Sequence, residues 1–215
     1  QEETEVDEEE TESFRKRYFE SFKNQAFGGN RADYIEKLRL LNDDEEIISN
    51  GGIGGIKVYR VPNGGGTVKV IITNNSFSVP TDDLINIVQE KIDPIQYTGD
   101  GMGIAPIGHF VTIEPVKSIN INIETNIDLK QGYEIDDIKL YIEEAIEDYI
   151  EELCKTWEQN SSIIIRISHI ESAILNVLGV EDVKNTKINQ SNQNFVLDDY
   201  SIPSRGEINV NWLFT

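Results

Sequence analysis

The strongest constraint on the fold is a change in the spacing of apolar residues near residue 130. From residue 119 to 129, isoleucine and leucine alternate with polar residues, and only Thr125 breaks the pattern. A period of two is typical of an antiparallel strand with one buried face. From residue 134 to 157, apolar residues recur every three or four positions, which predicts a long amphipathic helix. A half-buried strand followed by a helix that can cover it predicts an α+β fold.

Shorter elements are predicted after this helix. A strand is expected at residues 163–167, followed by a helix that opens with a capping box, in which Ser168 is the N-cap and Glu171 lies three residues later. Gly179 is expected to end that helix. Closing strands are predicted at residues 180–188, 194–197 and 207–212. The C-terminal part is therefore a β-α-β-α-β-β sandwich with helices on one face of an antiparallel or mixed sheet.

A second α+β module is predicted before residue 94. An amphipathic pattern at residues 14–23 predicts its first helix, and Asn30 is a suitable N-cap for the second. Two β-type runs, at residues 56–61 and 67–73, flank a Pro-Asn-Gly-Gly-Gly segment that is typical of a hairpin. A final helix follows Thr81. The predicted order is α-α-β-β-α.

Residues 94–108 contain two prolines and several glycines, so we expect a flexible connector and a domain boundary there. The predicted organisation is an acidic leader at 1–12, a middle module at 13–93, this connector, and a C-terminal module at 109–215. The chain begins at Gln1 and its only methionine is Met102. We therefore expect it to be a fragment of a longer protein, with the leader coming from a missing N-terminal domain.

The charge of the chain argues against two classes of partner. With 39 acidic and 19 basic residues, its net charge is −20, which repels nucleic acid and anionic membranes. Residues 134–158 hold many of the acids. A solvated helix face is the simple interpretation, and the sharper one is that this face orients a basic partner protein. The candidate contact residues are Glu143, Glu144, Glu147 and Glu151.

We predict no catalytic, cofactor-binding or metal-binding residues. His169 is explained by its place in a capped helix, and His109 has no motif partner. Asp100 lies among glycines and falls short of a calcium loop. Cys154 is expected to be a packed thiol. No apolar run approaches the roughly 18 residues of a membrane span, and there is no secretion signal, so we expect a soluble protein made in the cytoplasm.

Several segments, in the same order along the chain, resemble the baseplate J-like family of contractile phage tails and tail-like bacteriocins. Examples are Gly-Asp-Gly-Met-Gly-Ile-Ala-Pro-Ile-Gly at 99–108 and Val-Leu-Gly-Val-Glu-Asp-Val at 177–183. Other matching stretches lie at 7–15, 28–34, 56–59, 66–68, 132–133 and 202–203. One departure is Glu134, where a hydroxyl N-cap is usual, so the long helix is expected to begin less sharply.

The resemblance implies a virion or prophage structural protein without enzymatic activity. Family members are wedge proteins that pair within wedges, contact other wedge and hub proteins, and assemble around the tail hub in the bacterial cytoplasm. The implied function is to hold neighbouring proteins in the baseplate. Two alternatives stay open: a free-standing acidic protein-binding module with no enzymatic activity, and an enzyme. The second alternative would require clustered titratable groups, such as His109 beside carboxylates in a cleft.

Overall fold

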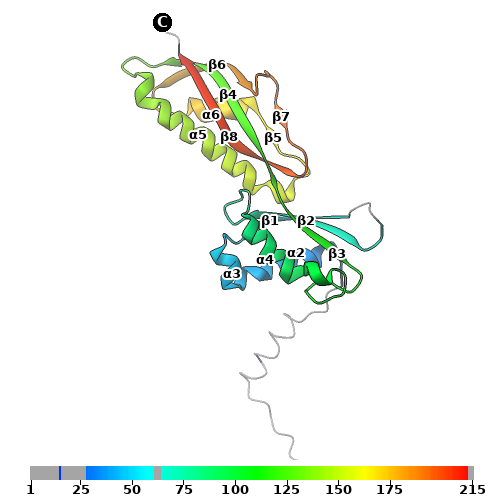
Figure 1. The fold of residues 1–215 in the computed structure, drawn as a ribbon. Coiled ribbons are helices and arrows are strands. Elements are labelled where there is room, and N and C mark those ends of the chain that lie inside the picture. Colours follow the sequence, from blue (N-terminus) through cyan, green and yellow to red (C-terminus); the bar gives the residue numbers. More distant parts are fainter. Residues whose placement is uncertain (1–14, 16–27, 61–63, 213–215) are drawn as a thin grey trace, which may run out of the picture.

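The computed structural model describes residues 15, 28–60 and 64–212, which form two α+β modules stacked along one axis (Figure 1). The predicted α+β class is confirmed. The acidic leader and, apart from Arg15, the helix expected at 14–23 lie outside the described residues.

The first module begins with helix α2 (Arg31–Leu40), a 3₁₀ turn (Leu41–Asp43) and the short helix α3 (Glu45–Ser49). The predicted N-cap Asn30 is confirmed: its side chain accepts a hydrogen bond from the Asp33 N–H at 3.1 Å, and the Asp33 carboxylate completes a capping box. Helix α4 (Asp82–Ile92) follows Thr81 as predicted, and Thr81 is its N-cap, whose hydroxyl accepts from the Leu84 N–H.

The first sheet contains strands β1 (Ile53–Arg60), β2 (Thr67–Asn74) and β3 (Phe110–Pro115), in that order. The predicted hairpin is confirmed, because β1 and β2 pair antiparallel. Strand β3 pairs with β2 in parallel, so residues 110–115 complete the first sheet, whereas the sequence pattern had assigned them to the C-terminal module. The chain passes from the first sheet to the second at Val116.

The segment at 94–108 is an ordered loop and not the flexible connector that was expected. The buried carboxylate of Asp93 accepts from the backbone N–H of Gly99 at 3.0 Å and from that of Val111 at 2.8 Å. The Ala105 N–H donates to the Ile92 carbonyl at 2.8 Å. A Cβ at Gly103 would lie 2.5 Å from that carbonyl oxygen, so this glycine permits close packing against α4.

The second module follows β3 without interruption. Its elements are β4 (Lys117–Leu129), α5 (Ile135–Lys155), a 3₁₀ turn (Trp157–Gln159), β5 (Ile164–Ile165), α6 (Ile167–Leu175), β6 (Val180–Ile188), β7 (Phe195–Val196) and β8 (Ser201–Trp212). Strand β4 is central: it pairs antiparallel with β6 and parallel with β8. The second sheet is therefore mixed, and β5 and β7 form a separate pair.

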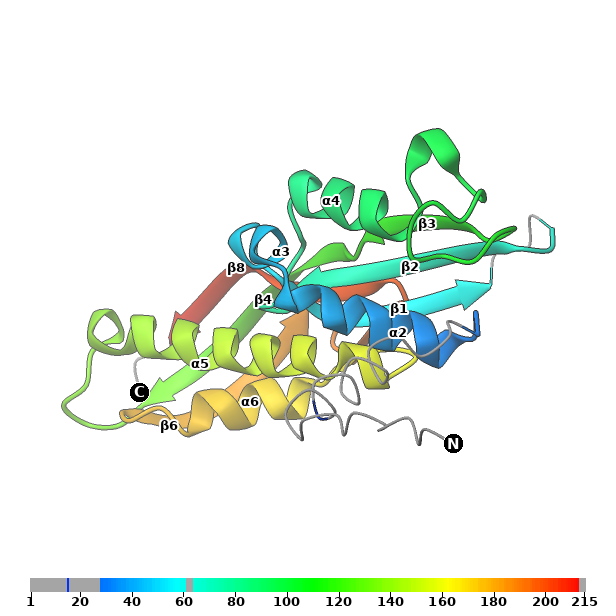
Figure 2. The ribbon, with the colours of Figure 1, turned by 90° about the horizontal axis from the view of Figure 1, so that it is seen from below.

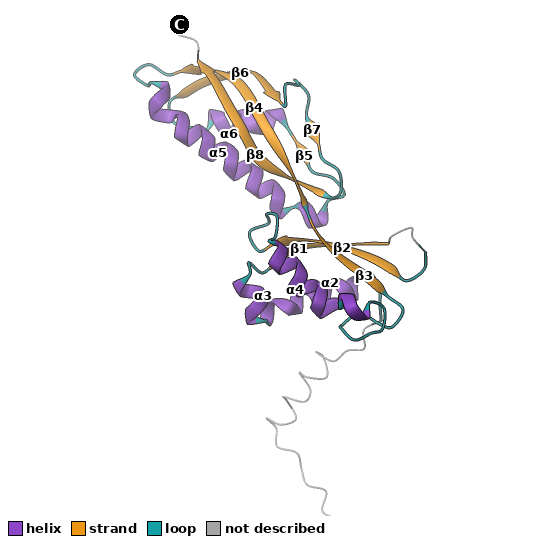
Figure 3. Cartoon of the chain, viewed as in Figure 1, coloured by secondary structure: helices purple, strands orange, loops and turns teal. Residues whose placement is uncertain are grey.

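Helices α5 and α6 lie side by side on one face of the second sheet (Figures 2 and 3). The predicted half-buried pattern of β4 is confirmed, because Ile121, Ile123 and Ile127 are buried. The interrupting Thr125 faces the same core, where its hydroxyl lies 2.8 Å from that of Thr186. The core face of α5 consists of Ile135, Ile138, Ile142, Ile146, Ile150 and Cys154. Each fully buried isoleucine contributes roughly 1.5–3 kcal/mol of hydrophobic free energy.

The capping box predicted at Ser168 is wrong. Helix α6 begins at Ile167, with Arg166 in the N-cap position and no side-chain cap. The Ile167 N–H donates to the Asn194 side chain at 3.0 Å, and the Arg166 N–H donates to the Tyr149 hydroxyl at 3.1 Å. Residues distant in sequence thus satisfy the donors that a local cap would have satisfied.

Candidate functional site

The middle of strand β1 is buried on both faces of the first sheet. Ile56 and Val58 of β1 belong to the core under α2 and α4, whereas Ile71 of β2 belongs to the core of the second module. The intervening positions of β1, namely Gly55, Lys57 and Tyr59, face the second module. Because residues 55–58 are buried on both faces, this part of β1 lacks a simple polar–apolar alternation.

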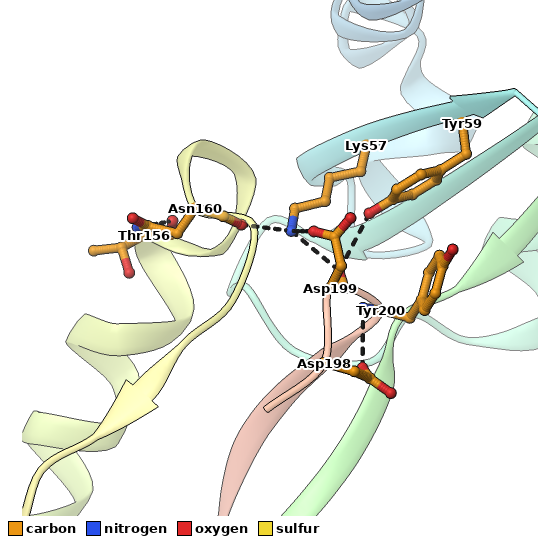
Figure 4. A network of polar contacts seen from close by, with 7 residues as sticks. All are labelled: Lys57, Tyr59, Thr156, Asn160, Asp198, Asp199 and Tyr200. Carbon is orange, nitrogen blue, oxygen red and sulfur yellow. Dashed lines mark hydrogen bonds and ion pairs between the residues drawn. The ribbon is translucent and has the colours of Figure 1, made fainter. Parts of the chain in front are cut away.

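Lys57 is the central polar contact between the modules. Its side chain is 9% exposed, and its ammonium donates to the Asn160 carbonyl at 2.7 Å, the Asp199 carbonyl at 3.0 Å and the Asp199 carboxylate at 2.5 Å (Figure 4). The nitrogen also lies 4.5 Å from the centroid of the Trp157 ring, in cation–π geometry. All three ammonium protons are therefore satisfied, as a buried charge requires.

Other contacts surround this lysine. The Tyr59 hydroxyl donates to the Asp199 carbonyl at 3.2 Å, and its ring lies 4.9 Å from that of Tyr200. Burial, together with the neighbouring Asp199, raises the pKa of Tyr59. Arg39 of α2 binds Glu158 at 2.6 Å across the same boundary. Together with the covalent continuity of β3 and β4, these contacts fix the two modules against each other.

The structure divides the acidic residues of α5 into two groups. Glu143 and Glu147 both bind Arg205 of β8, with 2.7 Å between the guanidinium and Glu147. Glu144 and Glu151 are exposed on the outward face of the helix, alongside the exposed side chains of Leu140 and Tyr141. Arg205 is distant in sequence, so the pattern of the helix alone could not reveal this division. Glu143 and Glu147 are thus engaged within the fold, whereas Glu144 and Glu151 form no ion pair among the described residues.

The titratable residues considered for chemistry do not converge. His109 lies 2.7 Å from the Tyr34 hydroxyl in the first module, whereas His169 packs against the Tyr149 ring in the second. The prediction that Cys154 is a packed thiol is confirmed: it donates to the Pro203 carbonyl at 3.3 Å, and burial raises its pKa to about 11.

The described part of the chain offers neither a metal cluster nor a membrane-spanning helix. Residues 15, 28–60 and 64–212 contain no group of three or more His, Cys, Asp or Glu side chains arranged to hold a metal ion. None of the helices within these same residues is long and apolar enough to cross a bilayer.

Two family models match the chain. The baseplate J-like central domain matches residues 26–115, and the baseplate J-like protein C-terminal domain matches residues 121–211. The interval between these matches contains Val116, where the chain leaves the first sheet.

Two curated proteins of Bacillus subtilis are similar over 204 residues, which is 95% of this chain. The phage-like element PBSX protein XkdT is 32% identical, and the uncharacterized protein YqbT is 33% identical. The chain spans 54% of the length of each.

Among solved structures, a chain from the cryo-EM structure of the anti-feeding prophage baseplate has a similar fold. Its TM-score is 0.51 at 11% identity, over 93% of this chain and 42% of that one. Both halves of the described fold thus correspond to domains of one family, and the chain belongs to the baseplate J-like family through its central and C-terminal domains.

Proposed function

We propose that the chain is a structural component of the baseplate wedge of a contractile phage tail or phage-tail-like particle, where it holds neighbouring proteins in place. Membership of the baseplate J-like family supports this role, as does similarity to a protein named for a phage-like element. The observation that carries the proposal is the fixed junction of the two modules. A protein that positions others needs a defined angle between its binding surfaces, and the buried Lys57 contacts supply one.

An apolar loop is one proposed contact surface. The segment between α4 and β3 exposes Ile95, Tyr97, Met102 and Ile107, and the Ile107 side chain is 82% exposed. The buried carboxylate of Asp93 anchors this loop through hydrogen bonds from the backbone N–H groups of Gly99 and Val111. Little conformational entropy would therefore be lost when a partner binds. Clustered exposed apolar residues on a soluble surface are typical of protein–protein contacts. We assign this loop to a neighbouring baseplate subunit.

The outward acids of α5 are the second proposed surface. Glu144 and Glu151 would meet a basic wedge or hub protein, or a basic surface of a second copy of this chain, by charge complementarity. In this proposal Glu143 and Glu147 stabilise the fold through Arg205 and take no direct part. The proposed role requires no enzymatic activity, nucleic acid or membrane.

Electron microscopy of particles that carry a label on this protein tests the proposal. Label confined to the baseplate end of the tail is expected. Label along the sheath or on the capsid would contradict a baseplate role, and so would normal tails from a strain that lacks the gene.

Complementation of the deletion strain tests the apolar loop separately. Ile107→Asp is expected to reduce the yield of complete tails strongly. Leu178→Asp is the matched control, because Leu178 is 73% exposed but lies in the second module, away from the loop. Equal yields from the two variants would remove the loop from the proposed interface.

A further inference from the structure

A hollow of about 300 Å³ lies on the first module, where the start of α2 meets β1 and β2. We call it the arginine pocket, after Arg31 and Arg60, which line it together with His109. Acids outnumber bases 39 to 19 in the chain, yet no Asp or Glu is among the described residues that line this hollow. The local charge is therefore opposite to that of the whole molecule.

The two arginines also differ from those basic residues of the described chain that bind carboxylates. Lys91 binds Asp44 at 2.9 Å, and Arg205 and Lys57 bind carboxylates in the second module. Arg31 and Arg60 are both exposed, and neither forms an ion pair within the described residues. Two arginines that line one hollow, with no Asp or Glu among its described lining residues, favour an anion there, although Arg31 also lines the neighbouring hollow with Glu158 and Asp199.

Tyr34 and His109 form a hydrogen-bonded pair beside the arginines. Burial, assisted by the charge of Asp93, raises the pKa of Tyr34 to about 12, so its phenol keeps its proton. A phenol is a better donor than acceptor, and it lies 2.7 Å from Nδ1 of His109. With the phenol as donor, Nδ1 accepts, which leaves the ring N–H of His109 at Nε2. The ring lies directly over Gly29, where a Cβ would be 2.7 Å from Cε1.

We propose that the arginine pocket binds an acidic segment of a partner protein through two or more of its carboxylates. A guanidinium presents paired N–H donors that match the two oxygens of a carboxylate, and such charge-assisted hydrogen bonds are among the strongest in proteins. The volume and the two cations fit one or two acidic side chains. The net charge of −20 opposes any long polyanion, so a short acidic segment fits this hollow better than the continuous backbone of a nucleic acid. This pocket and its ligand are independent of the baseplate role proposed above.

Fluorescence anisotropy of labelled hexaglutamate with the full 215-residue chain tests the proposal. We expect binding at about 0.15 M salt, where electrostatic effects extend about 8 Å. Arg31→Gln and Arg60→Gln should each weaken binding about tenfold or more, because each removes a charged hydrogen-bonding group. Arg166→Gln, which alters an exposed arginine of the second module outside the pocket, should leave binding unchanged. Labelled hexaglutamine should not bind.

A spectroscopic readout locates the site. The chain has two histidines, so titration with hexaglutamate should shift the NMR ring signals of His109 and leave those of His169 in place. Absence of binding, equal binding by all variants, or unchanged His109 signals would each overturn the proposal. Tighter binding of an oligonucleotide of matched charge would show that the pocket takes phosphates, and it would overturn the assignment to carboxylates. Matching circular dichroism spectra would establish that each variant is folded.

Discussion

The indole of Trp157, in the second module, lies directly against the backbone of Gly55 on β1 of the first. A Cβ at residue 55 would be 3.0 Å from Cε3 of the indole and 3.3 Å from the Thr73 hydroxyl. Glycine at this position therefore allows the two modules to approach each other closely. The same indole, which is 1% exposed, lies beneath the ammonium of Lys57. The aromatic and the ionic parts of the junction thus depend on one side chain.

Gly55→Val is expected to push the modules apart and to destabilise the protein by about 1–3 kcal/mol, because the added methyl groups overlap the indole and the Thr73 hydroxyl. Chemical denaturation measures the stability, and small-angle X-ray scattering measures the separation of the modules. Gly65→Val is the matched control, because a Cβ there would have nothing within 4 Å. If the two variants scatter and unfold alike, the contact at Gly55 does not set the junction.

Lys57 and Asp199 are expected to be strongly coupled in stability. Lys57→Met leaves the Asp199 carboxylate and the Asn160 carbonyl without their donor and should cost about 2–4 kcal/mol. A double-mutant cycle with Asp199→Asn should give a coupling energy of about 1–3 kcal/mol. The matched control is the pair Lys69 and Glu114, at 2.8 Å, whose side chains are 32% and 39% exposed. We expect that pair to contribute less than about 1 kcal/mol. Additive effects at Lys57 and Asp199 would refute the coupling.

The sequence predicted those elements whose pattern is repeated within one segment. The alternation of Ile121, Ile123 and Ile127 correctly predicted strand β4, and the helical spacing from Ile135 to Cys154 correctly predicted helix α5. Both predictions succeeded because each element buries one face against a single core. The cap at Asn30 and the start of a helix after Thr81 were also predicted correctly, because each depends on residues only a few positions away.

Features that depend on distant partners were not predicted. In the sequence, Lys57 resembles an ordinary exposed lysine of a strand. Only the folded structure places Asp199 and Trp157 around its ammonium. The glycines at 94–108 indicated flexibility. In the structure, Gly99 donates its N–H to the Asp93 carboxylate, and Gly103 packs closely against the Ile92 carbonyl. The arginine pocket combines α2, β1 and the loop before β3, so no local signal marks it. The spacing of apolar residues within one segment does not reveal which side chains of other segments will contact it in the fold.

Cys154 is expected to make stability depend on alkaline pH. Burial, followed by the nearby Glu151, raises the pKa of its thiol from 9.0 to about 11. Because the folded-state pKa is the higher one, the stabilising contribution is complete below about pH 9 and is lost as the pH rises to about 11.

Urea midpoints measured from pH 8 to 11 test this dependence. They should fall more steeply for the wild type than for Cys154→Ala, which retains every tyrosine. Parallel curves would exclude a contribution from the thiol. Iodoacetamide should label the folded wild type slowly and the urea-unfolded chain rapidly.

Gln89 of α4 protects the open edge of the first sheet. Its amide donates to the Val111 carbonyl at 3.0 Å, and its carbonyl oxygen accepts from the Ile113 N–H at 2.8 Å. The amide also donates to the Asp93 carbonyl at 2.6 Å, so Gln89→Met would remove the side-chain partner of three backbone groups and should cost about 2–4 kcal/mol. Hydrogen exchange at Ile113 should become faster. Asn86→Met, on the exposed face of the same helix, is the control, and an equal loss in both variants would contradict a role for the edge contact.

The two pairs of glutamates on α5 are expected to affect different properties: one pair the stability of the protein, and the other its incorporation into baseplates. Glu143→Gln with Glu147→Gln breaks both contacts to Arg205 and should lower stability by up to about 1 kcal/mol, since these ion pairs are partly exposed. Glu144→Gln with Glu151→Gln changes only exposed side chains and should leave the melting temperature unchanged. If the outward face binds a basic baseplate protein, only this second pair should reduce incorporation of the protein into purified baseplates. Both double variants remove two charges, so net charge alone cannot separate them. Equal incorporation of the two would exclude the outward face as a contact surface.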